Sequence, residues 1–276
     1  MELMIGRRRV GPGEPCLIMA EVGLAHDGSL SQAHAYIEAA RAAGADAVKY
    51  QCHLSDATGE WRVRPRWPQD SGRQEYWRRT GFSGEQWAGL ARHCAEEGLI
   101  FICSPFSPDA VKMLDSLVEV WKLPSGRVAS LALLDAVGLT SKPVLVSTGM
   151  STQEEATFAV TRLKEHGCAV GLMQCTSLYP CPPEYVGLGH VARWGGFSDH
   201  SGTIYPGIAA AALGCQVLEV HVVFSRAQGG FDVDASITVD ELVQLVRGVR
   251  FVEQAMARVD KDRVAAELQA TRRVFM

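Results

Sequence analysis

The sequence predicts a single α/β domain that folds as a (β/α)8 TIM barrel. Short apolar, β-branched runs alternate with longer amphipathic segments, which is the pattern of parallel strands joined by helices. Eight such units occupy about 250 residues in barrels of this kind, and the chain has 276 residues. No GxGxxG sequence follows the first strand, which argues against an open dinucleotide-binding sheet. We place the barrel domain in residues 1–256.

Eight apolar runs are the predicted strands. In order they cover residues 16–23, 46–51, 99–104, 119–124, 143–148, 169–175, 195–200 and 215–221. Helical periodicity fills most of the intervals, over residues 29–43, 83–97, 107–117, 151–166, 203–213 and 237–256. The connection 52–82 is the one long interval without a predicted element, and connections of that length are commonly functional.

Capping signals mark the ends of the predicted helices. Ser29 and Ser83 precede helical segments, and STQEE at 151–155 has the spacing of a capping box. Four helices are followed by a glycine that leads into the next strand, as expected for left-handed C-terminal caps; these are Gly44, Gly98, Gly167 and Gly214.

Bulk composition excludes several classes of function. The net charge of −4 argues against a nucleic-acid surface. No apolar run reaches about 18 residues, so we expect no membrane partner, and the first residues lack the apolar core of a secretory signal. The eight cysteines include no CxxC pair, so we expect reduced, buried thiols in a cytoplasmic protein.

Polar side chains gather at the carboxyl ends of the predicted strands, where barrels of this kind hold their active sites. Lysines and hydroxyls together favour an anion such as phosphate or carboxylate. Two histidines on adjacent strands are typical ligands of a divalent metal. Each residue alone also fits a structural role, such as an ion pair in the core. The strand-end residues include Glu21, Lys49, Gln51, Ser104, Lys122, Ser125, Ser177, Tyr179, Ser198, Asp199, His200, Glu219 and His221.

The heptapeptide GFSDHSG at 196–202 places Ser, Asp and His side by side. Adjacent residues do not usually form a hydrolase triad, because a triad is assembled from distant parts of a chain. We therefore interpret His200 as a metal ligand and Ser198 as facing the anion. Asp199 is expected to orient a neighbour or to cap the loop.

These segments resemble the sialic acid synthase (N-acetylneuraminate synthase) family. The resemblance runs from about residue 15 to 256 and includes IMAEVGLAHDGSL, AGADAVKYQ, FICSPF, VWKLPSG, KPVLVSTGMST, QCTSLYPCP, GFSDHSGTIYPGIAAAALG and LEVHVV. It implies a barrel in which phosphoenolpyruvate condenses with an amino-sugar aldehyde and phosphate leaves. It also implies a divalent metal, Mn²⁺ or Mg²⁺.

The resemblance assigns roles to individual residues. It implies that His200 and His221 bind the metal, that Glu21 is the acid/base, and that Lys49 and Lys122 bind phosphoenolpyruvate. A metal would polarise the aldehyde oxygen, and the lysines would neutralise charge that repels the nucleophile. Glu21, placed among cations, is expected to stay ionised. We also expect substrate contacts from Gln51, Ser104, Ser125, Ser177, Tyr179, Ser198 and Asp232.

The sugar side of the site departs from the family's pattern. Arg127 stands where the family has an acidic sugar contact, so we expect an acceptor that carries phosphate or carboxylate. Alternatively, Arg127 points to solvent or pairs with a nearby acid. Ala25, Val220 and Val233 replace a family Asn, Lys and His. These changes weaken the case for N-acetylmannosamine as the acceptor.

Residues 257–276 resemble the family's linker helix, and no antifreeze-like domain follows them in this sequence. We expect residues 52–82 or a separate protein to cover the site instead, or the chain to be catalytically weak. Barrels of this family pair into dimers, so a homodimer is expected.

Two other functions fit the residues. A pyruvate aldolase would use Lys49 or Lys122 as a Schiff-base lysine with a lowered pKa. A non-catalytic barrel that binds a sugar acid or a partner enzyme is the second alternative. The presence of Glu21, His200 and His221 together argues against it.

Overall fold

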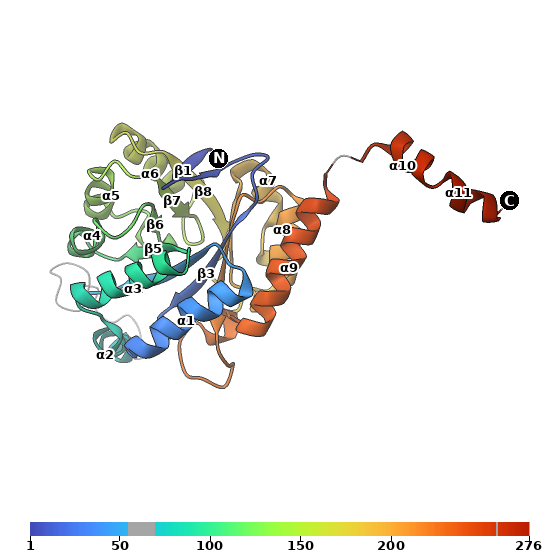
Figure 1. The fold of residues 1–276 in the computed structure, drawn as a ribbon. Helices are drawn as coiled ribbons and strands as arrows, with labels where there is room; N and C mark the ends of the chain where they lie inside the picture. The colour runs from blue at the N-terminus through green and yellow to red at the C-terminus, as the bar shows by residue number, and fades with distance from the viewer. Residues whose placement is uncertain (55–69, 258, 276) are drawn as a thin grey trace.

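The computed structural model describes residues 1–54, 70–257 and 259–275 and confirms the predicted barrel (Figure 1). Its eight parallel strands follow the order β10-β3-β4-β5-β6-β7-β8-β9, and β9 pairs with β10 to close the ring. Each corresponds to one predicted run: β3 (Leu17–Gly23), β4 (Ala47–Cys52), β5 (Ile100–Pro105), β6 (Trp121–Leu123), β7 (Val144–Ser147), β8 (Val170–Cys175), β9 (Gly196–Asp199) and β10 (Val217–Val223).

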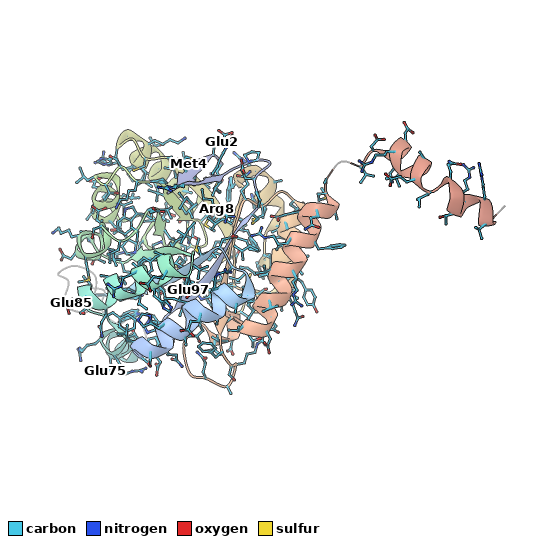
Figure 2. The ribbon with its side chains drawn as sticks, in the orientation of Figure 1. Glu2, Met4, Arg8, Glu75, Glu85 and Glu97 are labelled. Carbon is cyan, nitrogen blue, oxygen red and sulfur yellow. The ribbon has the colours of Figure 1, made fainter. Side chains whose placement is uncertain are left out.

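Helices cover the outside of the ring (Figure 1). They are α1 (Leu30–Ala43), α3 (Gly84–Glu96), α4 (Pro108–Leu114), α5 (Leu131–Gly138), α6 (Gln153–Glu165), α7 (Val191–Trp194), α8 (Tyr205–Ala212) and α9 (Val239–Ala255). The helices α5 and α7 lie outside the segments predicted from periodicity. Figure 2 shows Glu85 on the outer side of this layer, as expected for helices that turn an apolar face to the strands.

The predicted capping signals are confirmed. The Ser29 hydroxyl accepts a backbone N–H at the start of α1, and Ser83 and Thr152 form complete capping boxes. Gly44 ends α1 with a φ of 82°, a left-handed conformation that favours glycine. The other predicted capping glycines also have positive φ: Gly98, Gly167 and Gly214.

A hairpin that the sequence pattern did not reveal fills one end of the barrel. Strands β1 (Leu3–Ile5) and β2 (Arg8–Val10) pair antiparallel. Side chains such as Ile5 pack against inward residues of the ring, including Met19 and Ile102, at the amino ends of the strands. Among the described residues, the amino end of the barrel interior is therefore filled by apolar side chains.

The connection 52–82, predicted to lack an element, contains α2 (Asp70–Thr80); residues 55–69 lie outside the described residues. A short strand, β11 (Ile237–Thr238), adds to β10 in parallel. The predicted C-terminal helix is instead two short helices, α10 (Lys261–Glu267) and α11 (Gln269–Arg272), which extend away from the barrel (Figure 1). Among the residues that the structure describes, no helix is both long enough and apolar enough to span a membrane.

Candidate active site

A cavity of about 520 Å³ opens at the carboxyl ends of the strands, and every strand of the ring contributes to its lining. This is where active sites of such barrels lie. The cavity brings together all but one of the predicted site residues: Glu21, Lys49, Gln51, Ser104, Lys122, Ser125, Ser177, Tyr179, Ser198, His200, His221 and Asp232.

Two lysines and two glutamates form a buried network at the deep end of the cavity. The Nζ atom of Lys49 lies 2.7 Å from Glu21 Oε2 and 3.9 Å from Glu219 Oε2. Lys122 Nζ lies 3.4 Å from the same Glu219 oxygen. Strand register explains the proximity, because Glu21 is paired with Lys49 on the neighbouring strand. Buried charges are tolerated when they are paired in this way.

Each lysine is also held by a hydroxyl from the next strand. Lys49 Nζ donates to Ser104 Oγ at 3.1 Å, and Lys122 Nζ donates to Ser147 Oγ at 2.6 Å. The hydroxyls of Ser125 and Ser177 lie 2.8 Å apart nearby. An ammonium keeps further donor capacity after one such bond, so this end of the cavity offers several donors to an anion.

Glu219 lines the cavity, and its role was not predicted from the sequence. Ser198 Oγ donates to its Oε1 at 2.8 Å. Burial raises the pKa of Glu219, but the ammonium groups of Lys122 and Lys49 outweigh burial and lower it to about 2. Glu219 is thus an ionised partner shared by both lysines. Its position two residues before His221 on the same strand could have revealed it, because residues two apart on a strand face the same side.

Burial and a neighbouring cation act in opposite directions on the pKa of Glu21. Burial raises its pKa, and Lys49 and Gln51 offset this rise only in part. Complete burial of the carboxyl outweighs the attraction of one ammonium, so the pKa is raised, and the ionised state of Glu21 stays a prediction. A carboxyl with a raised pKa is better suited to accept and return a proton near neutral pH than an ordinary carboxyl.

Two histidines face each other at one side of the cavity. The Nδ1 atom of His200 lies 2.9 Å from the Thr176 carbonyl, which only accepts, so Nδ1 carries a proton and Nε2 is the nitrogen left for a metal. Tyr179 Oη lies 3.1 Å from that Nε2. The His200 and His221 ring centroids are 5.2 Å apart, and His221 Nδ1 lies 4.0 Å from Asp232 Oδ2.

This arrangement fits an open metal site. A backbone carbonyl on the far nitrogen of a ligating imidazole is a common orienting contact. Burial lowers the pKa of His221 to about 4, which keeps it neutral. Burial also lowers the pKa of His200, but Cys175 outweighs it and raises the value to about 9, so a metal must displace a proton.

The protein supplies few metal ligands of its own. Within residues 1–54, 70–257 and 259–275, no group of three or more His, Cys, Asp or Glu side chains is arranged to hold a metal. A metal held by His200 and His221 would thus keep positions for water or substrate, as catalytic sites do.

Asp199 caps the loop, as interpreted from the sequence. Its Oδ1 accepts the Ser201 N–H at 2.9 Å, and its Oδ2 accepts the Ser201 hydroxyl at 3.1 Å. Burial raises the pKa of Asp199 to about 6. Its side chain lies outside the cavity lining and contacts the loop that follows β9 instead.

Arg127 is the predicted site residue that the cavity lining does not include. It ends the turn Ser125–Arg127, directly after Gly126, which does line the cavity. The side chain is half-buried, and with the described residues its guanidinium forms no ion pair. Pairing with a nearby acid is therefore not seen among the described residues, and the Arg127 Nε is buried without a hydrogen-bond partner.

Comparison with known proteins agrees with this geometry. The NeuB family model matches residues 36–261. The chain is 32% identical to human N-acetylneuraminate-9-phosphate synthase over 287 residues, covering 97% of this chain and 78% of that protein. It is 29% identical to N,N'-diacetyllegionaminic acid synthase of Campylobacter jejuni over 257 residues, covering 87% and 77%.

A solved structure shows the same fold. The N-acetylneuraminic acid synthetase from Leptospira borgpetersenii, in complex with citrate, has a TM-score of 0.85 and 24% identity, covering 99% of this chain and 98% of that one. The resemblance read from the strand-end motifs is confirmed, and the protein belongs to the NeuB family.

Proposed function

We propose that the protein is a metal-dependent synthase that condenses phosphoenolpyruvate with a sugar aldehyde and releases phosphate. The product is a 2-keto-3-deoxy sugar acid. The observation that carries this proposal is the pair of buried ammonium groups, Lys49 and Lys122, at the closed end of one cavity. Its relatives in the NeuB family include synthases of neuraminate and legionaminic acid derivatives, which supports the product class.

Phosphoenolpyruvate fits the deep end by charge. Lys122 and Ser125 would hold the phosphate, and Lys49 with Ser104 would hold the carboxylate. These contacts neutralise the anion, which otherwise repels an approaching nucleophile. Glu219 attracts both ammonium groups and offsets their mutual repulsion before the substrate arrives.

His200 and His221 would hold the divalent metal, Mn²⁺ or Mg²⁺, which supplies Lewis-acid polarisation of the aldehyde oxygen when bound. The Thr176 carbonyl fixes the orientation of His200. Asp232, close to His221 Nδ1, and Tyr179, beside His200, place polar groups where the acceptor hydroxyls enter.

Glu21 would move the proton in the overall reaction. Carbon 3 of phosphoenolpyruvate forms the new bond to the aldehyde carbon, and water adds at carbon 2. The carbon–oxygen bond to phosphate then breaks, leaving a ketone and inorganic phosphate. Glu21 would accept one proton from the attacking water and return it to the former aldehyde oxygen, which becomes a hydroxyl, while the second water proton leaves with the phosphate. The Gln51 amide orients Glu21 Oε1 for this at 2.8 Å.

A phosphate-release assay tests this function. The protein is incubated with phosphoenolpyruvate, Mn²⁺ and a panel of neutral and phosphorylated sugar aldehydes. We expect phosphate release that requires both an aldehyde and the metal, with a chelator-treated sample as control. Absence of release with every aldehyde would rule the synthase out.

One observation favours a second candidate, a pyruvate aldolase. Burial lowers the pKa of Lys122 despite the nearby Glu219 carboxylate, and a Schiff-base lysine needs a lowered pKa. Borohydride would then trap pyruvate on the protein irreversibly. Trapping without any release of phosphate from phosphoenolpyruvate selects the aldolase, and the converse result selects the synthase.

Arg127→Glu is expected to raise the KM for the acceptor about 10- to 100-fold and to leave the KM for phosphoenolpyruvate within about twofold. The reason is that a guanidinium next to the cavity-lining Gly126, without a carboxylate partner among the described residues, can bind an anionic group of the acceptor. Hydrogen bonds to charged groups are the stronger kind. Arg127→Lys is the charge-matched control. Unchanged acceptor kinetics in Arg127→Glu would remove Arg127 from the acceptor site.

A further inference from the structure

His53 lies just after β4 and forms an aromatic wall of the cavity with two neighbours. Its ring stacks on Phe106, with centroids 3.8 Å apart, and on Trp77 of α2, with centroids 5.1 Å apart and planes 16° apart. All three line the cavity. We call His53, Trp77 and Phe106 the aromatic wall.

The same imidazole begins a row of two hydrogen bonds, from His53 through Gln51 to Glu21. His53 Nε2 lies 3.1 Å from Gln51 Oε1, and Gln51 Nε2 donates to Glu21 Oε1 at 2.8 Å. Because the Gln51 amide nitrogen faces the carboxylate, its oxygen faces His53. An amide oxygen only accepts, so His53 Nε2 must carry a proton.

The backbone of β3 is shaped around this row. A Cβ at Gly23 would lie 3.1 Å from Gln51 Nε2 and 3.3 Å from Glu21 Oε1. Gly23 also has a φ of 56°, a conformation that favours glycine. A glycine is therefore what allows the Gln51 amide to reach the carboxylate over this strand.

The wall is anchored independently of the row. Tyr76 Oη donates to the Leu24 carbonyl at 3.1 Å, and Arg79 pairs with Asp27 at 2.6 Å, so α2 is fixed to the loop after β3. Burial lowers the pKa of His53 to about 3, with Arg127 and Lys49 acting in the same direction. The ring is thus neutral near pH 7 and keeps one donor.

We propose that His53 is a positioning residue with two separable tasks. Its ring, with Trp77 and Phe106, receives an apolar C–H face of the acceptor, and its Nε2–H fixes the Gln51 amide that orients Glu21. This rests on the proposed synthase function. The charged deep end suits phosphoenolpyruvate, whereas an aromatic surface suits the mixed polar and apolar faces of a sugar. Acceptor binding and base orientation therefore meet at one side chain.

Two substitutions separate the tasks. His53→Phe keeps a ring in the wall but removes the donor, so we expect kcat to fall about tenfold while the acceptor KM stays within about twofold. The acidic limb of the pH–rate profile should move to higher pH, because the Gln51 hydrogen bond lowers the pKa of Glu21. His53→Gln keeps an N–H donor but removes the ring, so the acceptor KM should rise about three- to tenfold with little change in kcat.

One further variant tests the aromatic wall alone, and another serves as a control. Trp77→Ala alters the wall alone, so it should raise the acceptor KM and leave the pH profile unchanged. His190→Phe is the matched control, since this exposed histidine stacks on Trp194 at 4.9 Å outside the cavity lining, and it should leave all constants unchanged.

The proposal is overturned if His53→Phe and His53→Gln lower kcat and raise the acceptor KM alike, or if His53→Phe leaves the pH profile in place. Retained thermal unfolding temperatures show that the variants are folded, and Trp77→Ala still tests the wall if one is not. A wild-type protein that releases no phosphate contradicts the synthase itself, whereas an active wild type with unaffected His53 variants contradicts this inference only.

Discussion

Glu21→Gln is expected to lower kcat by about 10²- to 10⁴-fold, the range that a positioned proton-transfer group contributes. The substitution preserves size and burial but removes the group that accepts a proton. Phosphoenolpyruvate binding should be retained, because the change removes a negative charge 2.7 Å from the Lys49 ammonium. Steady-state phosphate release gives kcat, and calorimetric titration with phosphoenolpyruvate gives binding.

The pH profile checks the same assignment. In the wild type, activity should rise with pH through the pKa of Glu21, which burial places above its ordinary value of 4.5. That limb should be absent in Glu21→Gln. Glu184→Gln, on an exposed turn, serves as the control and should behave as wild type. A Glu21→Gln variant that keeps wild-type kcat would show that the proton moves elsewhere.

Glu219→Gln is expected to reduce the free energy of unfolding by about 3 kcal/mol at pH 7. The side chain is 4% exposed and is the shared partner of Lys122 and Lys49. An amide of the same shape cannot compensate two buried ammonium groups. Urea unfolding of both proteins measures the difference, with Glu184→Gln expected to stay within about 0.5 kcal/mol of wild type.

The destabilisation has a defined pH dependence. The pKa of Glu219 is about 2 when folded, below its ordinary value of 4.5. A carboxyl with a lowered folded pKa stabilises fully above its unfolded pKa, and this contribution is lost as pH falls toward the folded value. The gap between wild type and Glu219→Gln should therefore shrink between about pH 4.5 and 2. A difference in the free energy of unfolding that does not change with pH would show that the shape of the side chain, not its charge, causes the destabilisation.

Most of the fold could be predicted because each strand of the ring is long or apolar enough to stand out. All eight predicted runs coincide with strands of the barrel. The hairpin Leu3–Val10 was missed because its two strands have three residues each, too few to show a period. Helix α2 was missed because its sequence is polar and Arg-rich, so no apolar stripe marks it.

The site was predictable in position and less so in electrostatics. Strand-end reasoning found the lysines and histidines because alternation places them inside the ring. The direction of the Glu21 pKa required its burial, which a sequence does not report. His53 escaped notice because its partners, Trp77 and Phe106, come from α2 and from the end of β5 and meet it only in the folded chain.

The hairpin at the amino ends of the strands has a kinetic consequence. With that end filled by side chains such as Ile5, the described residues leave the cavity open at the carboxyl ends of the strands. A small anion can reach the deep end of the cavity only before a larger molecule occupies the part nearer the opening. If the protein is the proposed synthase, phosphoenolpyruvate should thus bind first and the sugar second. Excess sugar should then bind before phosphoenolpyruvate and inhibit turnover.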